Sequence, residues 1–84
     1  MSIYDKVKAA FEAAKISGST EAIYLSILLG DMDEAIKNGD TPELIFDNNK
    51  LNAKKLLESS MKYQDGFYYD QAMLIIRILN GLEA

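Results

Sequence analysis

The sequence predicts an all-α protein, a single compact helical domain of four to six helices over residues 1–84. Apolar residues recur at helical spacing near the N-terminus and again after residue 49. Two further helices are expected at residues 20–29 and 67–81, and each contains a nearly unbroken apolar run, residues 22–29 and 72–79 respectively. Because such runs must be surrounded, we expect these two helices to be central and to pack together.

Capping residues mark the first two helices. Ser2 is suited to begin the first helix, and Gly18 is suited to end it in the left-handed conformation. Ser19 or Thr20 begins the second helix, whose apolar run also fits a buried β-strand; the helix-type flanks favour the helix. On the first helix, the residues expected to face the core are Ile3, Val7, Ala10, Phe11 and Ala14.

Glycine and asparagine residues predict further breaks in the middle of the chain. Gly30 suits the end of a helix and Asp31 the start of the next, although a continuous helix would cost only about 1 kcal/mol relative to alanine. Pro42 predicts a short helix whose apolar residues are 44–46, because proline at the first helical position loses no needed hydrogen bond. A separate helix is then expected to begin at Asn49 or Asn52.

The last helix offers no ordinary solvent face in its middle, since only Arg77 is polar between Ala72 and Leu79. The residues expected to face the core are Tyr69, Ala72, Met73, Ile76 and Leu79. The opposite arc then holds Asp70, Leu74, Arg77, Ile78 and Gly81, with Leu74 and Ile78 exposed beside Arg77.

Two arrangements would cover this arc. A second copy could bury Leu74 and Ile78, and Arg77 could then reach the acidic middle segment of that copy. Alternatively, the short helix around residues 44–46 covers the arc within one chain. The shortage of polar residues in both central helices favours self-association, so a homo-oligomer is expected.

The composition argues against most enzyme chemistry. The chain has neither cysteine nor histidine, which removes thiolate nucleophiles, disulfides, the commonest general base and the commonest transition-metal ligand. We expect no enzyme activity, no catalytic residue and no cofactor. The first six residues lack a signal-peptide pattern, and no apolar run reaches the roughly 20 residues that span a bilayer, so a cytoplasmic location without membrane contact is expected.

Charge is unevenly distributed along the chain. The net charge is −4, but residues 21–47 hold seven acids against the single base Lys37. Such a segment can steer a basic partner or pair with the basic region of another copy; a solvated rim that keeps the protein soluble is the simpler interpretation. The candidate steering residues are Asp31, Asp33, Glu34, Asp40 and Glu43.

Neither metal nor nucleic acid is an expected ligand. The acids around Asp31 break the calcium-loop pattern at once, and helix capping explains Asp31 and Glu34 without a metal. Four of the eight lysines lie in residues 50–62, the main basic concentration, and Arg77 is the only arginine in an acidic chain. Nucleic-acid binding proteins typically have a more basic domain, so this partner is disfavoured.

Aromatic residues gather where the last two helices meet. Four of the eight aromatic residues lie within residues 63–69, and aromatic side chains with polar groups are typical of protein interfaces. We expect Tyr63 and Tyr68 on the surface, whereas Phe67 and Tyr69 fit either the core or an interface. The interaction candidates are Tyr63, Phe67, Tyr68, Asp70, Leu74, Arg77 and Ile78.

These observations predict a small acidic helical protein that acts by protein–protein interaction, as a regulator or inhibitor that occupies a partner's surface. One alternative is a homo-oligomer that binds or sequesters a small ligand, such as a nucleotide, between copies through tyrosine and lysine side chains. A structural subunit of a larger assembly is the third.

Overall fold

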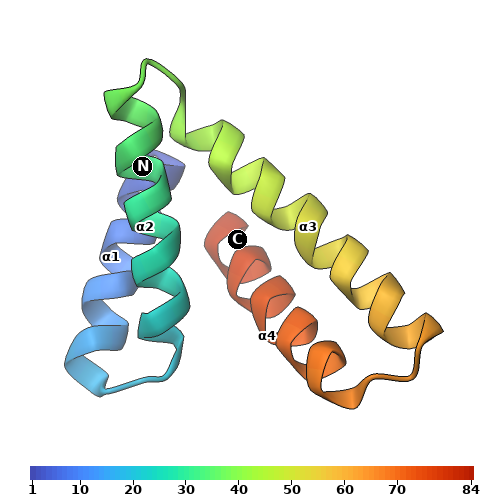
Figure 1. Ribbon diagram of the computed structural model, residues 1–84. Coiled ribbons are helices and arrows are strands. Elements are labelled where there is room, and N and C mark those ends of the chain that lie inside the picture. Colours follow the sequence, from blue (N-terminus) through green and yellow to red (C-terminus); the bar gives the residue numbers. More distant parts are fainter. The chain divides into compact units, whose positions relative to one another are not determined.

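The computed structural model describes residues 1–84 as four α-helices without a β-strand (Figure 1). The helices are α1 (Ile3–Ser17), α2 (Glu21–Lys37), α3 (Pro42–Lys62) and α4 (Gly66–Glu83). The predicted all-α class is confirmed, and the number of helices lies within the predicted range. The chain comprises two compact units, Met1–Phe46 and Asp47–Ala84. A single domain over all 84 residues stays a prediction, as does the packing of the two apolar runs against each other.

In the first unit, α1 and α2 pack against each other as an antiparallel pair (Figure 1). The Ser2 hydroxyl begins α1 by accepting a hydrogen bond from the backbone N–H of Asp5 at 3.1 Å. Gly18 ends α1 in the left-handed region, with φ at 69°. Both predicted caps are therefore confirmed. The Tyr4 hydroxyl donates a hydrogen bond to the Asp33 carboxylate at 2.5 Å and links the exposed edges of the two helices.

The helix α2 continues through Gly30, so the break predicted there is wrong. Met32 and Ala35 extend the buried face that Leu25 and Leu28 begin, at the spacing of one continuous helix. Burying Met32 alone contributes about 1.5–3 kcal/mol, which outweighs the roughly 1 kcal/mol that glycine costs inside a helix.

The helix α3 is also continuous, so the predicted separate helices around residues 44–46 and after Asn49 are wrong. Pro42 begins it as expected. Phe46, Ala53 and Ser60 are buried at steps of seven residues, which places them on one face of a single helix. An interruption after Phe46 would remove this common face, and so the asparagine-rich segment stays helical.

The second unit consists of α3 from Asp47 onward and of α4, which run antiparallel and are joined by a tight turn (Figure 1). Gln64 in this turn has a positive φ of 54°. The Asp65 carboxylate caps α4 by accepting a hydrogen bond from the backbone N–H of Tyr68 at 3.2 Å. At the other end of the pair, Lys50 Nζ of α3 lies 2.8 Å from Glu83 Oε1 of α4. None of the four helices has the length and apolarity needed to cross a membrane.

Candidate interaction surfaces

The turn between α3 and α4 displays three aromatic side chains, Tyr63, Phe67 and Tyr68, which we call the turn cluster. The exposed fractions are 72%, 67% and 50%, respectively. The expected surface position of Tyr63 and Tyr68 is confirmed, and Phe67 is exposed as well. The Phe67 and Tyr68 rings meet edge to face, with centroids 5.3 Å apart and planes at 80°. This arrangement is a favourable one for two aromatic rings, so the pair supports itself on the surface.

Two further groups adjoin the turn cluster. The Lys62 Nζ lies 5.5 Å from the centroid of the Tyr63 ring, within range of a cation–π interaction. A hollow of about 350 Å³ lies between the end of α3 and the start of α4, lined in part by Tyr63, Tyr68 and Leu56. Ser60 also lines this hollow, but its hydroxyl already donates to the Leu57 carbonyl at 2.8 Å. The hollow therefore offers mainly ring and aliphatic surface.

The outward face of α4 differs from the predicted one. Asp70 and Arg77 are exposed as expected and Leu74 is half-buried, but Ile78 is only 8% exposed, so its predicted exposure is wrong. Met73 takes an exposed position instead of the predicted core position. Since the helix is apolar nearly all round, its sequence carried no signal for its rotation about its own axis. Tyr69, left open between core and interface, is also exposed.

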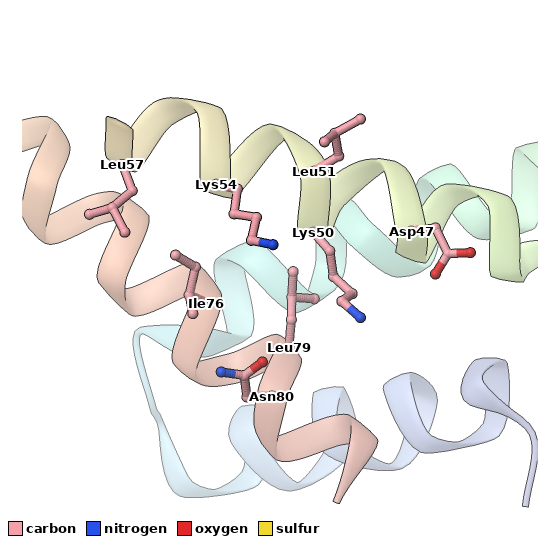
Figure 2. A pocket seen from close by; sticks show the side chains of 8 residues that line it. All are labelled: Asp47, Lys50, Leu51, Lys54, Leu57, Ile76, Leu79 and Asn80. Carbon is pink, nitrogen blue, oxygen red and sulfur yellow. The ribbon is translucent and has the colours of Figure 1, made fainter. Parts of the chain in front are cut away.

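A groove of about 520 Å³ runs between α3 and α4 (Figure 2). Its aliphatic lining comes from Leu51, Leu57, Ile76 and Leu79, and its polar lining from Asp47, Lys50, Lys54 and Asn80. Figure 2 shows Leu57, Ile76 and Leu79 turned toward the space between the two helices, whereas Leu51 points away from α4. Lys50 and Lys54 extend from α3 into the same space.

The two groove lysines differ in their surroundings. Lys50 is paired with Glu83, and the hydrogen bond from its amine to that carboxylate raises the pKa of Lys50. Lys54 makes no ion pair. The groove was not predicted from the sequence, in which Lys50 and Lys54 were noted only as part of the lysine-rich residues 50–62. The spacing of Lys50, Lys54 and Leu57 at i, i+4 and i+7 was the available signal, since it puts them on one stripe of α3.

The candidate steering acids are spread over α2, the α2–α3 link and the start of α3. All five, Asp31, Asp33, Glu34, Asp40 and Glu43, are exposed. No three of the chain's carboxylates converge into a group that could hold a metal ion. Asp33 accepts the hydrogen bond from Tyr4, and this bond raises the pKa of Tyr4. Burial, followed by the negative charge of Asp31, raises the pKa of Tyr24 to about 12.

The helix α2 carries exposed aliphatic residues that the sequence reasoning placed in the core. Ile23 is 69% exposed and Ile27 is 59% exposed. Together with Gly30 and Glu34 they form a stripe at i, i+4, i+7 and i+11, on the side of α2 away from its buried face. We call these four residues the α2 stripe. A run of apolar residues does not reveal which of them face outward, which explains the miss.

The tyrosine and lysine side chains considered for a small ligand line separate hollows. Tyr63 and Tyr68 line the hollow at the turn, whereas Lys50 and Lys54 line the groove, which contains no aromatic ring. Comparison of the chain with protein-family models, with curated proteins and with solved structures finds no match.

Proposed function

We propose that this protein is a non-enzymatic regulator or inhibitor that binds another protein through the turn cluster, Tyr63, Phe67 and Tyr68. The observation that carries the proposal is the edge-to-face pair of Phe67 and Tyr68, which leaves at least half of each side chain exposed. Contiguous apolar patches on a surface often mark interaction sites, and aromatic side chains are enriched among the residues that dominate binding energies.

The backbone under the turn cluster favours this use. Asp65 caps α4 directly beneath Tyr68, and Phe67 and Tyr68 both belong to the first turn of α4. A partner would therefore meet side chains on a fixed helix end, which lowers the conformational entropy lost on binding. The partner is expected to bring an apolar pocket for the rings, together with hydrogen-bonding groups for the tyrosine hydroxyls.

The double variant Phe67→Ala/Tyr68→Ala tests the proposal. Tagged wild-type chain should capture a partner from a cytoplasmic extract of the native host, and the double variant should not. With the identified partner, calorimetry should show a dissociation constant weakened by about 100-fold or more, as expected when two central aromatic residues are lost. The melting temperature should stay within a few degrees of wild type, because at least half of each side chain is exposed.

The control is Ile16→Ala, which removes an even more exposed apolar side chain, on α1. This variant should bind like wild type. Undiminished binding by the double variant, or equal weakening by the control, would contradict the proposal. A bound small-molecule mass on the natively purified chain would favour the ligand-binding alternative instead, and recovery only within a large complex would favour a structural subunit.

A further inference from the structure

We propose that the α3–α4 groove binds the α2 stripe of a second copy of this chain, with the bound α2 antiparallel to α3. The turn cluster takes no part in this contact, so the inference is independent of the proposed function. Its basis is a match in apolar surface, in charge and in spacing between two exposed surfaces of the same sequence.

The groove and the α2 stripe both expose aliphatic side chains that could cover each other. The groove has an aliphatic lining from both helices, and the α2 stripe presents two isoleucines of which more than half is exposed. An amphipathic helix that lays its apolar residues into a groove between two helices is a recurring mode of protein recognition. Burial of Ile23 and Ile27 would remove the largest aliphatic exposure on α2.

The groove and α2 also carry opposite charges beside their apolar residues. Lys50 and Lys54 lie along the α3 side of the groove, and Asp31 and Glu34 are exposed beside and within the α2 stripe. Lys54 makes no ion pair within the chain, so a carboxylate from another copy would give it a partner. Opposite charges at the edge of an apolar contact fix its orientation more than they strengthen it.

The spacing of these residues along α2 and α3 favours an antiparallel direction for the bound α2. Ile27 and Glu34 are seven residues apart on α2, about 10 Å along the helix, and Lys50 and Leu57 are seven residues apart on α3. With Glu34 opposite Lys50 in an antiparallel pair, Ile27 falls opposite Leu57. In the same register, Asp31 reaches Lys54 and Ile23 falls opposite Met61.

That last pair supports the register, because Met61 is another exposed apolar residue, 62% exposed. Met61 continues the helical stripe of Lys50, Lys54 and Leu57 at i+11 from Lys50. One antiparallel register therefore sets two acids opposite two lysines, of which Lys50 already pairs with Glu83 and would be shared with Glu34. It also sets two isoleucines opposite two apolar residues. A parallel helix would place the isoleucines against the lysines.

A charge-exchange experiment tests the contact. Sedimentation velocity of the full chain from about 1 µM to about 500 µM should show self-association, a range that covers weak and moderate affinities. Lys54→Glu and Asp31→Lys should each weaken it by about tenfold or more, as expected for like charges placed together. A mixture of the two variants should associate again, because every groove then meets a stripe of opposite charge.

Matched controls use the same charge changes outside the contact. Lys55→Glu lies next to Lys54 on α3 but does not line the groove, and Asp40→Lys lies in the α2–α3 link. Both should self-associate like wild type. A wild-type chain that stays monomeric throughout, or self-association that Lys54→Glu and Lys55→Glu weaken equally, would overturn the inference.

Cysteine cross-linking tests the register, since the chain has no cysteine of its own. An Ile23→Cys chain mixed with a Met61→Cys chain should form a disulfide-linked heterodimer under mild oxidation. The neighbouring Lys62→Cys, which points away from the α3 stripe, should cross-link at least about tenfold less, as the steep distance limits of disulfide geometry require. Equal cross-linking at both positions would overturn the antiparallel register.

Discussion

Tyr24 lies partly buried on α2, and burial, with a smaller contribution from Asp31, raises its pKa from 10.0 to about 12. The fold therefore favours the neutral hydroxyl. The resulting stabilisation is complete below the unfolded pKa of 10.0 and is lost as the pH rises through about 12.

The prediction at this residue is a loss of stability in alkaline solution. Between these two pH values the free energy of unfolding of wild type should fall by roughly 2 kcal/mol more than that of Tyr24→Phe. Urea unfolding at a series of pH values, followed by circular dichroism, measures the difference. Tyr63→Phe, at an exposed position, is the control and should keep the wild-type fall. Parallel pH profiles for wild type and Tyr24→Phe would contradict the prediction.

At the scale of the helices, replacing a glycine by alanine should have opposite effects on stability inside a helix and at a helix end. Gly30 lies inside α2 with ordinary backbone angles and open space around an added Cβ, so Gly30→Ala should stabilise the fold by about 0.5–1 kcal/mol. Gly18 ends α1 at a φ of 69°, and Gly18→Ala should destabilise by about 1–2 kcal/mol despite equal space. Urea unfolding in dilute protein measures both; a destabilised Gly30→Ala would refute the account of α2.

Helical spacing and capping residues predicted the class and most helix ends, because both signals are local. Ser2, Gly18 and Pro42 act where the sequence placed them. The predicted breaks in α2 and α3 failed for a non-local reason. Met32 and Ala35 in α2, like Ala53 in α3, lie on buried faces, and this burial outweighs the local preference to end a helix.

The interaction surfaces were only partly predictable, because exposure also depends on how the helices pack. The turn cluster follows from the composition of residues 63–69, since a turn between two helices lies on the surface. The exchange of Ile78 for Met73 could not be foreseen, because an apolar helix gives no sign of which side it buries. Helical spacing indicates the stripes on α2 and α3, but the lining that α4 adds to the groove depends on how α3 and α4 are placed.

At the scale of the whole molecule, charge is separated along the chain. Residues 21–47 carry seven acids and one base, whereas the remaining residues carry six acids and eight bases. Asp40 and Glu43 lie in this acidic segment, at the α2–α3 link and the start of α3, and both are exposed. They belong neither to the turn cluster nor to the groove. Exposed charges outside a contact act mainly on the rate of association, by attracting an oppositely charged surface before contact.

The prediction at this scale concerns the partner that the turn cluster binds. If its surface is basic, Asp40→Asn/Glu43→Gln should slow association by several-fold at low salt and leave dissociation within about twofold of wild type. Surface plasmon resonance at two ionic strengths measures both rates, and the difference between variant and wild type should shrink as salt screens the charges.

Phe67→Ala/Tyr68→Ala should show the reverse pattern, with faster dissociation and a nearly unchanged salt dependence, because it removes apolar surface and no charge. Equal effects of the acidic double variant at low and high salt would mean that Asp40 and Glu43 touch the partner directly, and would refute a steering role.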